Sequence, residues 1–182
     1  MVLLPMQDVT GQIFRCLYVP EPMPISQLAK AMEEADFLAA PWRDPTAEVP
    51  LAHLQERFEG RLLVAEPWRL AFPEAGVLIS SSISGGNLKS RFLQSAEQAP
   101  SRCWLLAEPL CMAFPLPCPD GQGTPAELPK DPGFFSESLG CRYVHSPEQV
   151  ILFDTDETLE LKRQWAMEAG FVGCIDMQKR RR

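Results

Sequence analysis

The 182-residue sequence contains only two histidines, no C-x-x-C cysteine pair and no long apolar run. The scarcity of histidine and the absence of close cysteine pairs argue against a zinc site. No apolar stretch approaches the roughly 20 residues of a membrane-spanning helix. The apolar start, Met1–Met6, is too short for a signal sequence and has no positive charge before it. We therefore expect a soluble, cytoplasmic protein with reduced cysteines, no metal and no cofactor.

The chain is acidic, with a formal net charge of -7 and a pI near 4.9. This balance argues against nucleic acid as a main partner and, with the lack of an apolar span, against a membrane. The last four residues, 179–182, are all basic. A short basic end is most often a solvated tail, and we interpret it so. The remaining class of partner is a glycan or another small molecule, and the sequence does not indicate an oligomeric state.

A short sequence pattern recurs along the chain. Phe37–Arg43 is echoed by Leu63–Arg69 and more weakly by Leu105–Leu110, and Cys16–Pro20 ends in the same way. Each copy is an apolar run that stops at proline, which is typical of a buried strand, since proline cannot donate to the next ladder position. Strands repeated with helical patterns between them indicate a parallel sheet whose carboxyl ends share one rim.

Helical spacing of apolar residues separates these runs. We expect helices that begin at Pro24, Pro50 and Asn87, and a fourth that follows Asp154. We expect strands at 12–19, 36–40, 61–65, 76–83, 103–107, 141–145, 149–153 and 171–175, the sixth and seventh paired as a hairpin. Residues 1–182 are thus predicted to form a single α/β domain, with βα repeats that build a small or degenerate TIM-like barrel.

The proline-rich segment 109–133 interrupts this pattern. Such a long loop inside a compact domain is usually functional or mobile. One hypothesis for the whole protein is therefore a structural or interaction role, with this loop as the docking segment.

The predicted strand ends supply the first candidate site. Trp42, Glu66, Trp68 and Glu108 would lie near one rim of a parallel sheet. Two carboxylates beside a substrate, with indole rings as stacking platforms, are the equipment of a glycosidase or sugar-binding cleft. Alternatively, the tryptophans cover the end of the barrel or pack under the next helix, while the glutamates cap helix N-termini.

A second candidate is the serine- and glycine-rich segment Ser80–Asn87. Glycines just before a helix leave backbone N–H groups free to hold an anion. No Walker-type lysine pattern or G-x-G-x-x-G accompanies them, so a tight strand-to-helix turn is the simpler interpretation.

A third candidate is the D-x-D-x-T sequence at Asp154, Asp156 and Thr158, which follows an apolar strand. It resembles the first motif of the haloacid-dehalogenase phosphatases. That resemblance implies Asp154 as nucleophile, Asp156 as general acid and base, Thr158 in support, and Mg²⁺. However, too little chain follows to supply the later motifs of that family. A helix cap is the preferred interpretation, and a phosphatase-like enzyme remains an alternative function.

Residues Phe135–Met177 are similar to the end of family 18 glycoside hydrolases, the chitinase-like barrels. The similarity lies in Arg142–Val144, Ile151–Asp154, Leu161-Lys162 and Gly170–Gly173, and upstream in Ile83–Gly86 and Arg91–Leu93. The resemblance implies a barrel with a carbohydrate site.

The family's D-x-x-D-x-D-x-E strand is absent, because only Glu108 is acidic between Trp104 and Phe114. The last-strand tryptophan is absent too. We therefore expect a carbohydrate or small-ligand binding domain without the family's catalysis. Trp42 and Trp68 would stack on the ligand, Glu66 and Glu108 would bind it or act as catalytic residues, and Asp154 and Asp176 come next as ligand-binding residues.

Overall fold

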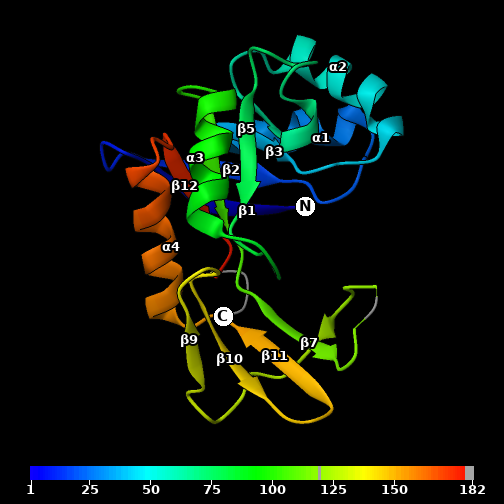
Figure 1. Ribbon diagram of the computed structural model, residues 1–182. Coiled ribbons are helices and arrows are strands. Elements are labelled where there is room, and N and C mark those ends of the chain that lie inside the picture. The colour runs from blue at the N-terminus through cyan, green and yellow to red at the C-terminus, as the bar shows by residue number, and fades with distance from the viewer. Residues whose placement is uncertain (119, 179–182) are drawn as a thin grey trace.

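The computed structural model describes residues 1–118 and 120–178 and has two parts, a closed barrel and a separate antiparallel sheet (Figure 1). Within these residues seven strands build the barrel, in the order β1-β12-β6-β5-β4-β3-β2. Their bounds are β1 (Val2–Asp8), β2 (Ile13–Tyr18), β3 (Phe37–Ala40), β4 (Leu62–Ala65), β5 (Gly76–Ser80), β6 (Cys103–Ala107) and β12 (Gly173–Asp176).

The prediction of an α/β fold with βα repeats in a TIM-like barrel is wrong. The barrel is mixed, because β1 runs antiparallel to both of its neighbours, β2 and β12. The N-terminal segment was not expected to be a strand; a tight turn, in which Asp8 Oδ1 accepts from the backbone N–H groups of Thr10 and Gln12 at 2.9 Å each, folds β1 onto β2. In addition, no α-helix connects β4 to β5. Among the described residues, strands dominate the architecture and the four α-helices are short.

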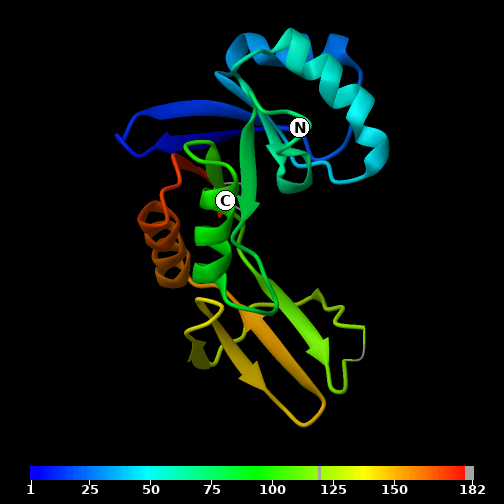
Figure 2. The same cartoon turned by 45° about the horizontal axis from the view of Figure 1, so that its top comes forward.

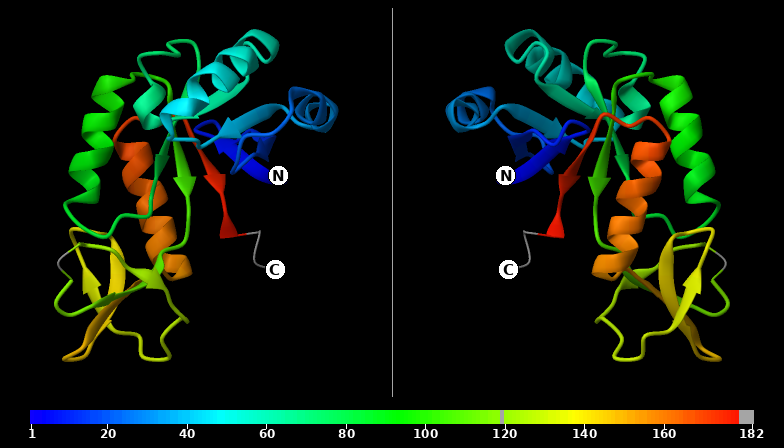
Figure 3. Two further views of the ribbon diagram at one scale, coloured as in Figure 1. Left: turned by 90° about the vertical axis from the view of Figure 1, so that its right-hand side faces the viewer. Right: turned by 90° about the vertical axis from the view of Figure 1, so that its left-hand side faces the viewer.

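The helices pack on two sides of the barrel (Figures 1 and 3). They are α1 (Ile25–Ala31), α2 (Glu48–Arg57), α3 (Leu88–Gln98) and α4 (Asp156–Glu168), with single 3-10 turns at η1 (Met32–Glu34), η2 (Pro45–Ala47) and η3 (Glu66–Trp68). One apolar cluster lies between β2, β3, β4 and the pair α1 and α2, and another between β5, β6 and the pair α3 and α4. None of the helices in the described part of the chain is long and apolar enough to cross a membrane.

The interior of the barrel is filled by alternate residues of its strands, and its amino end is closed by aromatic rings. Trp104 lies there, with the centroid of Phe37 at 5.9 Å and that of Phe14 a further 5.4 Å away. Gly76 and Gly173 make room for it, since a Cβ on either glycine would meet the indole ring. The other end, where the parallel strands finish, is left as the open mouth.

The second sheet is inserted between β6 and α4, and its strand order is β8-β7-β11-β10-β9. Its strands are β7 (Cys111–Pro115), β8 (Thr124–Pro125), β9 (Phe134–Ser136), β10 (Cys141–His145) and β11 (Gln149–Phe153). The predicted hairpin is therefore present as β10 and β11. Segment 109–133 is not a plain loop, because it contains β7 and β8. The basic tail at 179–182 lies outside the described residues.

The sheet joins the barrel on the side of its mouth. In Figure 3 the arrowhead of β12, in red, points toward the sheet, and β6 continues directly into β7. Side chains of the sheet, among them Cys141 and Leu152, pack with Leu110, Leu139 and Ile83 from the connecting segments. Gly140, at a φ of +62°, lies against the ring of Trp165 on α4. Figure 2 shows the sheet extending away from this junction.

Candidate ligand site at the mouth of the barrel

A hollow of about 460 Å³ lies at the carboxyl ends of the parallel strands. The residues around it come from the ends of β2, β5 and β6, from the segments that follow β2, β3, β5 and β6, and from α3. They are Tyr18, Pro20, Pro41, Arg43, Ser80, Ser82, Arg91, Leu106 and Glu108. Most of these positions continue the alternation that points every second residue of a strand inward, so the mouth is a direct extension of the barrel interior.

Hydrogen bonds fix the serine and glutamate side of the mouth. Ser81 Oγ donates to the carbonyl of Glu108 at 3.1 Å and accepts from its backbone N–H at 3.0 Å, which ties the end of β5 to the end of β6. The Oγ of Ser80 lies 3.4 Å from Oε2 of Glu108 and accepts from the backbone N–H of Ser82 at 3.0 Å. The mouth therefore presents hydroxyl groups and one carboxylate in a fixed arrangement.

The two carboxylates expected to flank a substrate are separated. Glu108 lines the mouth, but Glu66 does not. Both carboxylate oxygens of Glu66 are engaged by α3: Oε2 lies 3.2 Å from the guanidinium of Arg91, and Oε1 accepts from Ser95 Oγ at 3.0 Å. Glu66 thus acts on the mouth indirectly, by holding Arg91 at its edge.

Neither tryptophan of the predicted rim lines the mouth. Trp42 is only 4% exposed, and its Nε1 donates to the carbonyl of Val19 at 2.8 Å. The Nε1 of Trp68 donates to the carbonyl of Trp42 at 2.8 Å, and its ring packs on Phe72 with centroids 6.0 Å apart. Both rings belong to the apolar layer under α1 and α2. The alternative interpretation, in which these tryptophans pack under helices, fits this placement.

Asp154 forms the centre of a buried polar network away from the mouth. Its Oδ2 accepts from Lys162 Nζ at 2.8 Å and from the backbone N–H of Leu110 at 2.9 Å, and its Oδ1 accepts from Thr158 Oγ1 at 2.9 Å. The side chain of Asp154 is 0% exposed and that of Lys162 1%. A carboxylate so enclosed cannot reach a phosphoryl group, so the geometry does not favour the phosphatase interpretation.

The same segment forms the predicted helix cap. Thr155 Oγ1 accepts from the backbone N–H of Thr158 at 3.3 Å, and Thr158 Oγ1 accepts from that of Thr155 at 2.8 Å. This reciprocal pair begins α4. Beside the network, burial raises the pKa of the Cys141 thiol to about 11, so this thiol stays protonated at neutral pH.

Asp176 lies in a second hollow, of about 400 Å³, between the end of β12, the start of α4 and β7. Its Oδ2 lies 3.3 Å from Arg163, and its Oδ1 accepts from the backbone N–H of Gln178 at 2.8 Å. Asp156 accepts from the side chain of Gln178 at 2.7 Å. The predicted ligand residues Asp154 and Asp176 therefore share this second hollow and are absent from the mouth. Among the described residues no cluster of side chains is suited to hold a metal ion.

Sequence reasoning identified Glu108 in the mouth and noted the segment that contains Ser80 and Ser82. It missed Tyr18, Arg43 and Arg91 as site residues. The signal that could have found the first two is the period of two: Tyr18 is the last inward-facing position of β2, and counting inward-facing positions past the end of β3 leads to Arg43. Arg91 carried no such signal, since it reaches the mouth from a helix outside the barrel wall.

Comparison of the chain with protein-family models, with curated proteins and with solved structures finds no match.

Proposed function

We propose that this protein binds a small polyhydroxylated molecule of the carbohydrate class in the mouth of its barrel, without hydrolysing it. The observation that carries the proposal is the lining of the mouth. Hydroxyl, carboxylate and guanidinium groups from Ser80, Ser82, Glu108, Arg43 and Arg91 converge on one hollow of about 460 Å³. A concave site with a few convergent polar groups is the usual form of a small-ligand pocket.

The carboxylates support binding without hydrolysis. Glycoside hydrolysis ordinarily needs two carboxyl groups that flank the scissile bond. Within residues 1–118 and 120–178, Glu108 is the only carboxylate that lines the mouth, and Glu66 is engaged with Arg91 and Ser95. A relationship of residues 135–177 to family 18 glycoside hydrolases is part of this proposal, but it does not bear on the mouth directly, because the residues that line the mouth lie between Tyr18 and Glu108.

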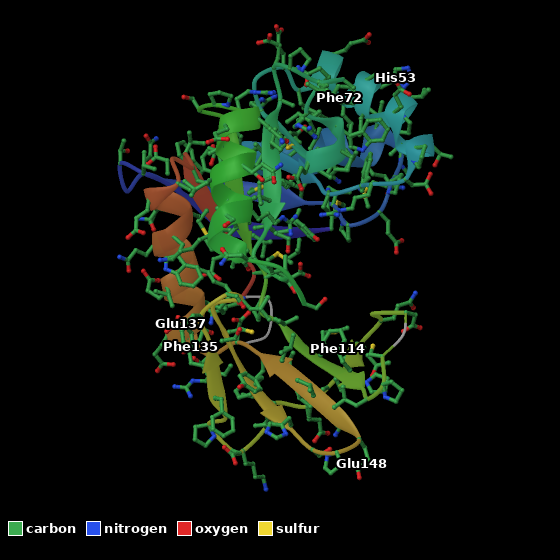
Figure 4. All side chains as sticks on the ribbon, in the orientation of Figure 1. His53, Phe72, Phe114, Phe135, Glu137 and Glu148 are labelled. Atoms are coloured by element: carbon green, nitrogen blue, oxygen red, sulfur yellow. The ribbon has the colours of Figure 1, made fainter. Side chains whose placement is uncertain are left out.

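The proposal is tested by calorimetric titration with a panel of neutral and acidic sugars. Glu108→Gln and Ser80→Ala should weaken the binding of any sugar that the native protein takes, because each removes a hydrogen-bonding group from the mouth. Glu148→Gln is the control, since Glu148 is exposed at the far tip of the β10–β11 hairpin (Figure 4). Binding that survives both mouth variants unchanged, or no binding of any sugar, would contradict the proposal. Release of product from chromogenic glycosides would contradict the absence of hydrolysis.

A further inference from the structure

We infer that the ligand of the mouth is anionic, a sugar acid or a sugar phosphate, and that Arg43 and Arg91 bind its charged group. This inference rests on the proposed function and narrows it to one chemical class. Among the described residues that line the mouth are two arginines and one glutamate, although the whole chain carries a net charge of -7. Glu66, outside the mouth, pairs with Arg91 but not with Arg43.

Arg43 lines the mouth from the segment that follows β3. Within residues 1–118 and 120–178 the structure records no ion pair for its exposed side chain. The neighbouring carboxylate, Asp44, is turned elsewhere: its Oδ1 accepts from the backbone N–H and the Oγ1 of Thr46, at 2.8 and 2.7 Å. Arg43 therefore brings an uncompensated positive charge to the mouth.

Arg91 reaches the mouth from α3 and is held in position. Its NH2 nitrogen lies 3.2 Å from Glu66, whose other oxygen is fixed by Ser95. A guanidinium has five N–H donors, and this contact uses one of its nitrogens. The remaining donors can address a ligand from a side chain that is already ordered, which lowers the entropic cost of binding.

The rest of the lining specifies what the anion is attached to. Ser80 and Ser82 can donate to or accept from hydroxyl groups, and Glu108 accepts from them. Guanidinium groups bind carboxylates and phosphates through paired, charge-assisted hydrogen bonds. The lining therefore fits a hydroxylated ring that bears one such anion, and both kinds of anion share this chemistry.

The test compares glucose, glucuronate and glucose 6-phosphate by calorimetric titration. These three sugars differ only at C6, which carries a hydroxyl, is a carboxylate or carries a phosphate. We expect at least one of the two anionic sugars to bind about tenfold or more tightly than glucose. A response to glucuronate alone assigns a carboxylate, and a response to glucose 6-phosphate alone assigns a phosphate. Raising NaCl from about 0.05 to about 0.5 M should weaken only the anionic ligands, since salt screens charge.

Variants at Arg43 attribute the effect to its guanidinium. Arg43→Gln should remove most of the preference for the anionic sugar over glucose and leave the part that Arg91 contributes, and Arg43→Lys should lose less, because a lysine keeps the charge but cannot form the paired contact. Arg57→Gln is the matched control: it removes the same charge from the exposed end of α2, outside the mouth. Circular dichroism checks that each variant is folded.

The two proposals fail differently. Equal binding of all three sugars, unchanged in Arg43→Gln, would overturn the anionic specificity and leave carbohydrate binding intact. No binding of these sugars or of any other in the panel would overturn both. Binding of the anionic sugars that Arg57→Gln weakens as much as Arg43→Gln would reduce the effect to net charge and overturn the role of Arg43.

Discussion

The barrel and the five-stranded sheet differ in how their strands are buried. Every residue of β4 and β6 is buried, whereas β7, β8 and β9 contain no fully buried residue. The barrel buries side chains on two surfaces, inside it and under its helices. The sheet has one small apolar cluster, which it shares with the connecting segments. The barrel therefore has a core of its own, and the sheet depends on the junction that joins the two.

The junction is unusual because its centre is polar. The Asp154–Lys162 pair connects the end of β11 with α4, and Asp154 also receives the N–H of Leu110, which precedes β7. A buried ion pair contributes less net stability than an apolar contact of equal volume, but breaking it is costly, because one charge is left buried. The buried pair thus makes the position of the sheet sensitive to a single residue.

The largest effect is expected from Lys162→Met, which removes the charge and keeps most of the apolar stem. The carboxylate of Asp154 would remain buried without its cation, so the free energy of unfolding should fall by about 3–5 kcal/mol. Urea denaturation measures this loss, and limited proteolysis should cut the sheet before the barrel. The double variant Asp154→Asn with Lys162→Met should recover much of the stability. A loss below about 1 kcal/mol in the single variant would contradict the junction's role.

A matched pair of phenylalanines compares the two regions directly. Phe92 on α3 is 0% exposed and packs on Phe171 with ring centroids 5.1 Å apart, whereas Phe134 on β9 is 61% exposed. Phe92→Ala should cost about 3–4 kcal/mol, since it opens a cavity beside the barrel wall. Phe134→Ala should cost less than about 1 kcal/mol, the value of its contact with the ring of Tyr143. Similar losses in thermal or urea unfolding would show that the sheet is not the weaker region.

The sequence was sufficient to predict most barrel strands. Strands buried on both faces need long apolar runs, such as 61–65 and 103–107, and such runs are visible in the local sequence. It was not sufficient for β1, in which a proline and a glutamine interrupt the apolar pattern. That strand is stabilised by pairing with β2 and β12, which lie far apart in the sequence. The TIM-like expectation, in which all strands are parallel, therefore failed because β1 enters the barrel antiparallel to both neighbours.

The candidate site was predictable only in part, because local sequence order places a residue at the rim but does not set the direction of its side chain. Glu108 follows a strand directly, so its place at the rim comes from local order alone. Trp42 and Trp68 also follow strands, yet their rings turn outward. In the layer under the helices each ring packs against apolar side chains and its N–H donates to a backbone carbonyl, which stabilises it more than exposure at the rim would. The direction of a side chain after a strand depends on what packs beside it, and the sequence does not contain that information locally.

A smaller effect is expected at two helix caps, one at the junction with the sheet and one beside the barrel. Thr155→Ala removes the cap of α4 at the junction, and Asn87→Ala removes that of α3, where Asn87 Oδ1 accepts from Ser90 N–H at 2.9 Å. Each should cost about 1 kcal/mol in urea unfolding. Only Thr155→Ala should also speed proteolysis of the sheet, because Thr158 of the same cap donates to Asp154. Equal proteolysis in both variants would argue that the cap and the junction are independent.

The smallest effect is expected from Glu160→Gln, which breaks a surface ion pair on the same helix as Lys162. Glu160 lies 2.9 Å from Arg163, but its side chain is 72% exposed. Solvent screens such a pair, so the loss in urea unfolding should stay below about 0.5 kcal/mol. Arg163 also keeps its contact with Asp176 at 3.3 Å. A loss as large as that of Lys162→Met would contradict the premise that burial, rather than ion pairing itself, makes the junction sensitive. A small loss in Glu160→Gln, beside a large one in Lys162→Met, would show that the junction is sensitive because the charge of Asp154 is buried.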